Sequence, residues 1–379
     1  MLVRDAIHDY IELDDDFSSL VDTPKLQRLR WIRQLGTSYL VYPGANHTRF
    51  EHSLGTYHLA SRLSKYLGLS REDDLTVRAA ALLHDIGHGP LSHVSEEVSL
   101  NTNGMTHEDI GCGIIKNGEI REILERMGVD PEELCSAIRG EGKHGVMISG
   151  EIDLDRMDYL SRDSYYTGVT NGVDLGRLLV TLRMVDDAMV ISENGLAAAE
   201  GLLVSRFLMY PTVYFHHTCR IAELMLVRGI ESLIEDGMRI GEIMAMDDIE
   251  LISAMEMAKG LPGEMIERIE KRNLYKRSAR IKIADLNFLD EPHRFEIEIA
   301  DRLSLDPKFV ILDVLPRRSF DLGKVTVLMK DGEIRKMSDL SPIASMLSHT
   351  KSREVRVYAP ADLKERVGKA ALAILCEDF

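Results

Sequence analysis

The sequence contains few cysteines and no long hydrophobic run. Four cysteines are spread over 379 residues without a CxxC pair, so neither a disulfide framework nor a zinc ribbon is expected. No apolar stretch approaches the ~20 residues that a membrane-spanning helix requires. The first residues, MLVRDAIHDYIELDDD, also lack the basic start and apolar run of a secretory signal. We therefore expect a cytoplasmic protein without a membrane segment.

Positive charge is also scarce. The chain has 46 lysines and arginines against 62 aspartates and glutamates, which gives a formal net charge of −16. Nucleic-acid binding depends largely on basic side chains that neutralise phosphates, so this balance argues against that function. A smaller phosphate compound could still be bound if arginines, lysines or a metal ion neutralised it locally.

Hydrophobic periodicity divides the chain into two parts. Residues 1–20 alternate as a short hairpin does, and Thr23 and Pro24 begin a predicted helix that should stop at Gly36. Helical patterns then dominate to about residue 280. After that, FEIEIADRL, KFVILDVL, KVTVLMKDGEI and EVRVYAP are interpreted as strands, with KDG as a turn, and LKERVGKAALAIL as a closing helix. We expect a helical domain at 1–284 and a small α+β lobe at 285–379.

Histidine and aspartate form the most informative pattern. The run AALLHDIGHGPLSH contains His84 and Asp85, with His52 upstream and Asp155 downstream. Two imidazoles and two carboxylates suit a divalent metal such as iron, manganese or zinc. A single histidine is more often an ordinary core or surface residue. Seven of the 13 histidines, however, fall between residues 47 and 107, and buried, unpartnered groups of this kind would be costly. A metal site is the better interpretation.

Several motifs are similar to those of a known family. HTRFEHSLG, LLHDIGHGPLSH, THEDIG and DLDRMDYLSRD resemble the HD superfamily, and most closely the catalytic core of the SAM-and-HD-domain dNTP triphosphohydrolases. DTPKLQRLRWIRQLG, RNLYK and EVRVYAPADLK extend the resemblance over nearly the whole chain. It implies a mainly α-helical HD-domain fold with a small C-terminal α+β lobe. It also implies cleavage of a dNTP into deoxynucleoside and inorganic triphosphate.

The resemblance assigns roles to individual residues. It makes His52, His84, Asp85 and Asp155 ligands of a divalent metal (iron, manganese, zinc or magnesium), with a second metal possible on the nucleotide. His88, His93 and His107 would lie at the reacting phosphate. Any of these three could protonate the leaving oxygen, and the resemblance favours His93. The implied substrate contacts are Gln34, Leu35, Arg49, Arg156, Tyr159, Asp163, Arg206, Tyr210 and Tyr214. Tyr210 stands where the family has histidine, and Pro211 interrupts the expected helix.

A regulatory nucleotide pocket is also implied. Its residues would be Asp22, Gln27, Arg30, Arg177, Arg272 and Lys276, with GTP or a dNTP as activator of a homo-oligomer, by resemblance a tetramer. Met1 and Arg4 depart from the family's lysine and asparagine. The alternative for Arg28, Arg30 and Arg33 is a solvated helix face.

Two other functions are open at this point. One is an HD phosphohydrolase acting on nucleoside monophosphates, cyclic nucleotides or a guanosine alarmone. The other is a nucleotide-sensing scaffold with weak activity. Product identity would separate the first from a dNTP triphosphohydrolase, and metal-free nucleotide binding would support the second.

Overall fold

The computed structural model describes residues 1–170, 172–282, 292–315, 324–348 and 354–377. Contacts divide the chain into two units. The first comprises Met1–Tyr214, Arg239–Leu251 and Phe320–Ser348, and the second Phe215–Met238, Ile252–Ser319 and His349–Phe379. Each unit has its own cluster of buried apolar side chains. Among the described helices, none is both long and apolar enough to cross a bilayer.

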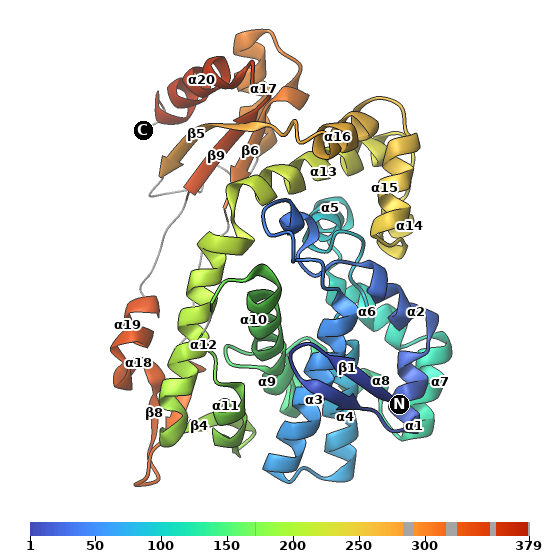
Figure 1. The fold of residues 1–379 in the computed structure, drawn as a ribbon, viewed down its shortest axis with the longest axis vertical. Helices are drawn as coiled ribbons and strands as arrows, with labels where there is room; N and C mark the ends of the chain where they lie inside the picture. Colours follow the sequence, from blue (N-terminus) through green and yellow to red (C-terminus); the bar gives the residue numbers. More distant parts are fainter. Residues whose placement is uncertain (171, 283–291, 316–323, 349–353, 378–379) are drawn as a thin grey trace. The chain divides into compact units, whose positions relative to one another are not determined.

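The first unit is mainly helical (Figure 1). Its helices are α1 (Asp15–Val21), α2 (Pro24–Gln27), α3 (Arg49–Leu67), α4 (Arg71–Leu83), α5 (His93–Asn103), α6 (His107–Ile115), α7 (Gly118–Met127), α8 (Pro131–Ile138), α9 (Gly142–Ile148), α10 (Leu154–Thr167), α11 (Leu175–Thr181), α12 (Leu196–Met209), α14 (Ile240–Ala245), α18 (Met337–Leu340) and α19 (Pro342–Ser348). Shorter turns are η1 (Arg28–Trp31), η2 (Gly36–Leu40), η3 (Glu193–Gly195) and the π-helical η4 (Tyr210–Tyr214). Helix α15 (Asp248–Met257) begins in this unit.

Two small sheets complete the first unit. Strands β1 (Leu2–Asp5) and β2 (Asp9–Glu12) form the predicted N-terminal hairpin. Strands β3 (Leu182–Val185), β4 (Ala188–Ser192), β7 (Thr326–Leu328) and β8 (Ile334–Lys336) form a second sheet in that order, with β4 and β7 parallel. The predicted KDG turn joins β7 to β8, and its Gly332 has φ +89°, which a glycine adopts without strain.

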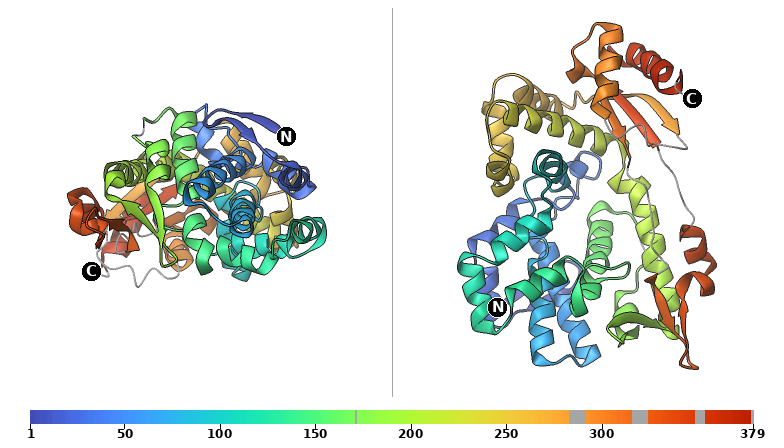
Figure 2. Two further views of the ribbon diagram at one scale, coloured as in Figure 1. Left: turned by 90° about the horizontal axis from the view of Figure 1, so that it is seen from below. Right: turned by 180° about the vertical axis from the view of Figure 1, so that it is seen from behind.

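The second unit is a three-stranded antiparallel sheet packed against helices. The sheet order is β5 (Lys276–Lys282), β9 (Glu354–Ala359), β6 (Ile311–Val314). Helices α17 (Pro292–Leu303) and α20 (Lys364–Glu377) pack on it, as the rear view in Figure 2 shows. Helices α13 (His217–Glu235) and α16 (Leu261–Glu270) pack on each other, and η5 (Pro307–Phe309) is a short turn.

The central helices of the first unit have strong end signals. Helix α3 begins after Thr48 with a capping box, in which Thr48 and Glu51 satisfy each other's backbone N–H groups, and it ends at Gly68 with φ +64°. Helix α4 ends where the His-Asp pair begins, with His84 as its C-cap. Helix α3 packs against α4 and α10. The packing brings together the first turn of α3, the end of α4 and the first turn of α10, which are distant in sequence.

Two predicted elements differ from the structure. The segment FEIEIADRL was expected as a strand but belongs to α17, in which Phe295, Ile299 and Ala300 are buried and Ile297 is 49% exposed. The buried positions follow a helical period, so the short alternation was misleading. The helix expected from Thr23 to Gly36 ends at Trp31 instead, after a 3-10 turn.

The domain boundary expected at residue 284 lies outside the described residues. The observed division places residues 215–238 with the C-terminal sheet and residues 320–348 with the helical unit. A sequence pattern cannot indicate such exchanges because they depend on strand pairing, here β4 with β7.

Candidate metal centre and surrounding site

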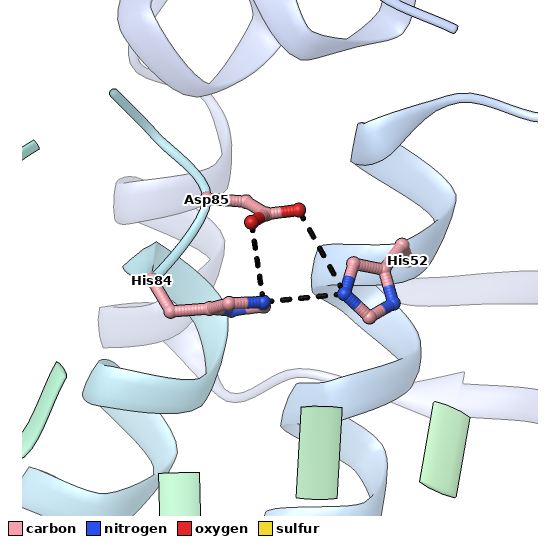
Figure 3. Close-up of side chains that lie close together, drawn as sticks. All are labelled: His52, His84 and Asp85. Atoms are coloured by element: carbon pink, nitrogen blue, oxygen red, sulfur yellow. Dashed lines mark hydrogen bonds and ion pairs between the residues drawn. The ribbon is translucent and has the colours of Figure 1, made fainter. Parts of the chain in front are cut away.

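Four predicted metal ligands converge from three helices. His52 lies on α3, His84 and Asp85 follow the last turn of α4, and Asp155 lies in the first turn of α10. His52 Nε2 is 3.2 Å from His84 Nε2 and 3.0 Å from Asp155 Oδ1. Asp85 Oδ1 is 3.4 Å from His84 Nε2, and Asp85 Oδ2 is 3.7 Å from His52 Nε2. Figure 3 shows His52, His84 and Asp85 pointing toward one another.

The two imidazoles are oriented as metal ligands require. His84 Nδ1 is 2.9 Å from the carbonyl oxygen of Ala81, and His52 Nδ1 is 2.8 Å from Asp158 Oδ2. Each ring therefore donates an N–H from Nδ1 and points Nε2 to the common centre, where a metal ion would take the place of any proton on Nε2. The donor set and its orientation fit a divalent metal held by nitrogen and oxygen.

The electrostatics of this centre favour a cation. Burial lowers the pKa of His52, but the hydrogen bonds to Asp155 and Asp158 outweigh it and raise the pKa to about 10. Burial likewise raises the pKa of Asp85, but Arg49, His84 and His88 outweigh it and hold the pKa well below its usual range. The carboxylates thus attract a positive charge to the space between the imidazoles, and a metal ion provides one.

The three predicted catalytic histidines form a second group beside the first. The rings of His88 and His107 stack with centroids 3.9 Å apart, and the ring of His93 lies 5.9 Å from that of His88. His88 Nε2 is 3.4 Å from Asp85 Oδ1, which joins the two groups. Glu96 contacts Nδ1 of both His93 and His107, although the sequence did not single it out.

The histidines of this group differ in exposure and charge. The His93 side chain is 76% exposed, whereas His88 is buried. Burial lowers the pKa of His88 well below its usual range, and Arg49 and His107 lower it further. Burial also lowers the pKa of His107, but the hydrogen bond to Glu96 reverses the shift and raises it. His88 is therefore neutral and His107 is the better proton donor near neutral pH.

The three predicted phosphate-binding arginines each pair with a carboxylate. Arg49 Nη1 donates to Asp85 Oδ2 at 2.5 Å and Arg49 Nε to Ser92 Oγ at 2.7 Å. Arg156 Nη1 donates to Asp153 Oδ2 at 2.5 Å. Arg206 Nη1 donates to Glu151 Oε2 at 2.6 Å. The pairs hold the guanidinium groups in the buried or half-buried interior of the unit.

A chain of aromatic rings leads away from the metal centre. The ring of Tyr159 lies 6.4 Å from that of His52 and 6.2 Å from that of Tyr214, and Tyr210 lies 5.5 Å from Tyr214. The expected helical spacing does not continue through Tyr210, because α12 ends at Met209 and a π-turn covers Tyr210–Tyr214. Pro211, which cannot donate a helical hydrogen bond, accounts for the change.

The proposed sugar-binding carboxylate is held on both sides. Asp163 Oδ1 is 2.8 Å from His47 Nε2, and Asp163 Oδ2 accepts a hydrogen bond of 2.8 Å from the Tyr214 hydroxyl. Sequence reasoning missed His47, which shares no motif spacing with Asp163. Gln34 is buried with no hydrogen-bond partner for Oε1 among the described residues, and Leu35 packs against the core.

Three of the predicted regulatory residues, Asp22, Gln27 and Arg30, lie close together in the first unit. Gln27 Nε2 donates to the carbonyl oxygen of Val21, next to Asp22, and Arg30 Nε donates to Gln27 Oε1 at 2.7 Å. Arg177 donates to the carbonyl oxygen of Asn194. Arg272 and Lys276 are exposed residues of the second unit.

The alternative of a solvated face for Arg28, Arg30 and Arg33 is wrong for Arg28. Its guanidinium group donates to the carbonyl oxygens of His88 at 2.6 Å and of Met246 at 2.7 Å. Arg28 thus anchors the loop that follows the His-Asp pair.

The fold and the site define an HD-domain hydrolase. The HD domain model matches residues 49–163, and the model of the HD associated region matches residues 173–376. The chain belongs to the HD domain family.

Relatives cover most of the chain. An uncharacterized protein of Methanocaldococcus jannaschii is 34% identical over 97% of this chain and 83% of its own length. The deoxynucleoside triphosphate triphosphohydrolase SAMHD1 of Homo sapiens is 29% identical over 73% of this chain and 54% of its own length, so this chain spans about half of that protein. A hypothetical protein from Aquifex aeolicus has a similar structure, with a TM-score of 0.82, 32% identity, and coverage of 98% of this chain and 99% of that one. A phosphohydrolase from Bacteroides thetaiotaomicron gives a TM-score of 0.78 with 27% identity, covering 95% and 99%.

Proposed function

We propose that the protein is a metal-dependent dNTP triphosphohydrolase that converts a dNTP and water into deoxynucleoside and inorganic triphosphate. The observation that carries the proposal is the convergence of His52, His84, Asp85 and Asp155 next to a histidine group and three arginines. The similarity to SAMHD1 supports the choice of substrate.

His52, His84, Asp85 and Asp155 would hold a divalent metal. When bound, it lowers the pKa of a water molecule and withdraws charge from a phosphoryl oxygen. The identity of the metal, iron, manganese, zinc or magnesium, is not specified by nitrogen and oxygen donors alone. A second metal ion would be carried in with the nucleotide as its counter-ion.

Arginines neutralise the triphosphate. Arg49, Arg156 and Arg206 are already oriented by Asp85, Asp153 and Glu151, so little side-chain entropy is lost when a phosphate arrives. Planar guanidinium groups can bind two phosphate oxygens at once. The negative net charge of the chain therefore does not prevent binding of an anionic substrate.

A histidine protonates the leaving 5′-oxygen. Glu96 contacts both His93 and His107, and its hydrogen bond raises the pKa of His107, which favours the protonated ring as the acid. His88 stays neutral and orients the reacting phosphate by hydrogen bonding. On the other side, Asp163 and Tyr159 bind the 3′-hydroxyl, while Gln34, Leu35, Tyr210 and Tyr214 line the sugar.

Nucleotide activation is a further part of the proposal. Asp22, Gln27 and Arg30 lie together and would bind GTP or a dNTP, with Arg177, Arg272 and Lys276 as additional contacts in a homo-oligomer. The proposal predicts that GTP raises both turnover and the oligomer size measured by light scattering.

The decisive test is product identification. Purified protein with Mn²⁺ is incubated separately with each dNTP, each NTP and a dNMP, with and without GTP, and products are separated by chromatography. Deoxynucleoside and intact triphosphate are expected, and His84→Ala should reduce turnover by more than about 100-fold, because loss of a mere partner of a metal ligand already costs about 10- to 100-fold. His144→Gln, which changes a buried histidine outside the site, is the control and should retain turnover. Orthophosphate from dNMP alone would instead identify a monophosphatase, and nucleotide binding without any turnover would favour a sensor.

A further inference from the structure

Behind the metal ligand His52 lies a chain of buried charges that none of the predicted roles uses. His52 Nδ1 is 2.8 Å from Asp158 Oδ2. Arg162 donates to the same carboxylate from Nε at 2.8 Å and from Nη2 at 3.0 Å. Its Nη1 also donates to Asp5 Oδ2 at 2.8 Å. The side chains of Asp158 and Arg162 are completely buried, so solvent does not screen these contacts.

The turn of the N-terminal hairpin completes this chain. His8 Nε2 is 2.6 Å from Asp158 Oδ1, and the His8 ring stacks on that of His58 with centroids 5.0 Å apart. The backbone N–H groups of Ile7 and His8 each donate to Asp5 Oδ1 at 2.9 Å. Both carboxylate oxygens of Asp158 and both of Asp5 therefore have hydrogen-bond partners. Through His8 and Asp158, the hairpin turn is connected to Nδ1 of His52.

A glycine on α3 makes room for the ion pair. Gly55 lies one helical turn after His52, and a Cβ atom there would overlap Asp158 Oδ1 and the Arg162 guanidinium and would lie 2.6 Å from Asp158 Cγ. A glycine inside a helix is destabilising relative to alanine. Its presence at this position is explained by the close approach of the carboxylate to the backbone of α3.

This geometry determines what His52 can do. An ionised Asp158 accepts the N–H of Nδ1, so the nitrogen of His52 that would lose its proton to bind a metal is Nε2, which is directed at the centre shared with His84 and Asp155. Arg162 and His8 keep the carboxylate in one orientation, and Asp5 balances the charge of Arg162. Partners of this kind usually raise metal affinity about 10- to 100-fold.

We propose that Asp158, held by Arg162, Asp5 and His8, is a positioning residue that fixes the tautomer and ring orientation of His52 for metal binding. The proposal rests on the metal role of His52 in the proposed function and is independent of the substrate.

The test measures metal affinity rather than turnover. Protein freed of metal with a chelator is titrated with Mn²⁺ alone, and free Mn²⁺ is followed by electron paramagnetic resonance. Asp158→Asn keeps the size of the side chain but loses its charge, and we expect Mn²⁺ to bind about 10- to 100-fold more weakly. Gly55→Ala should weaken binding in the same range because the methyl group displaces the Asp158–Arg162 pair. His8→Gln should weaken it less.

Two control variants separate positioning from stability. Gly113→Ala on α6 adds the same methyl group where nothing lies within 4 Å, and it should bind Mn²⁺ as the wild type does. Asp313→Asn in the second unit breaks a buried pair with Arg220, and it should lower the melting temperature without changing Mn²⁺ affinity.

The outcomes distinguish this proposal from the proposed function. The positioning role alone would be overturned if Asp158→Asn and Gly55→Ala both bound Mn²⁺ with wild-type affinity, whatever their melting temperatures. If Asp158→Asn fails to fold, Gly55→Ala decides, since alanine favours a helix. A wild-type protein that binds no Mn²⁺ would overturn both the positioning role and the metal-dependent function. Weakened Mn²⁺ binding with no dNTP turnover in the wild type would retain the positioning role and reject the substrate.

Discussion

At the scale of the residue, each imidazole of the candidate metal centre has a hydrogen-bond partner at Nδ1 and points Nε2 to the common centre. His84 donates to the carbonyl oxygen of Ala81 and His52 to Asp158, so both present Nε2 to the same centre. Glu96 acts similarly on His107, with the opposite consequence for charge: it favours the protonated ring. Neighbouring histidines thereby acquire different protonation behaviour through burial and through the charged groups that they contact.

Glu96→Gln should change the pH dependence of hydrolysis. Burial lowers the pKa of His107 and the contact with Glu96 raises it above its usual value. Without the charge of Glu96 the pKa falls, so the protonated acid is lost at lower pH. We expect the alkaline limb of the kcat profile to move to lower pH, measured by steady-state rates from pH 5.5 to 9.

A substrate analogue with a p-nitrophenolate leaving group provides the control for this prediction. This leaving group departs without a proton, so the Glu96→Gln variant should lose less activity on it than on a dNTP. An unchanged alkaline limb would show that Glu96 and His107 do not supply the proton.

At the scale of the element, hydrogen bonds from charged side chains hold the backbone of loops in place. The loop between Asp85 and His93 contains Leu91 with φ +56° and Ser92 with φ +52°, a conformation that is unfavourable for residues with a side chain. Asp248 Oδ1 accepts the N–H of Leu91 at 2.7 Å, and Arg28 holds the carbonyl oxygen of His88. Strain at a functional loop persists when its surroundings fix it in this way.

In the second unit, charged side chains also hold α17 in place, and one of them should make stability depend on pH. Glu296 accepts the N–H of Leu312 at 2.7 Å, contacts Arg228 and lies 2.8 Å from His293 Nδ1. The bond to Glu296 raises the pKa of His293. The stabilisation that the His293–Glu296 contact provides is therefore complete below the pKa of His293 in the unfolded chain, about 6.5. It disappears as pH rises through the higher pKa of His293 in the folded chain.

We expect thermal stability of the second unit to fall as pH rises above 6.5, and His293→Gln to flatten that part of the profile. Circular dichroism melts between pH 5.5 and 9 measure the effect, which is small because the His293 side chain is 60% exposed. The variant should match the wild type at high pH, where His293 is neutral in both folded and unfolded chains. The same slope in both proteins would reject a contribution from His293.

At the scale of the whole molecule, each unit has an apolar cluster of its own among the described residues, and the candidate metal site belongs to the first unit. All four proposed ligands belong to the first unit. Binding to the folded state alone adds about 2.7 kcal/mol of stability at a free ligand concentration 100 times the Kd. Mn²⁺ should therefore raise the melting temperature of the first unit and leave that of the second unchanged.

Differential scanning calorimetry with and without Mn²⁺ checks this prediction. Two transitions are expected, of which one moves with metal, and His84→Ala should abolish that movement. If both transitions move equally, the units do not unfold independently, and the metal stabilises the chain as a whole.

The sequence by itself determined the helical character, the hairpin, the KDG turn and the HD domain family. Local spacing specifies which side chains share a helix face, and adjacency in the motif fixes His84 and Asp85 at one helix end. The strand predicted for FEIEIADRL was wrong because a short alternation does not reveal which face will be buried.

Only the tertiary structure decided which distant groups meet. His8 lies 150 residues before Asp158 and His47 lies 116 before Asp163, and no local period connects such pairs. Their contacts arise from the packing of α3, α10 and the N-terminal hairpin. Short motifs thus indicate which residue types could bind a metal. The tautomers, pKa values and ring orientations of these residues depend on burial and on partners that folding brings from elsewhere in the chain.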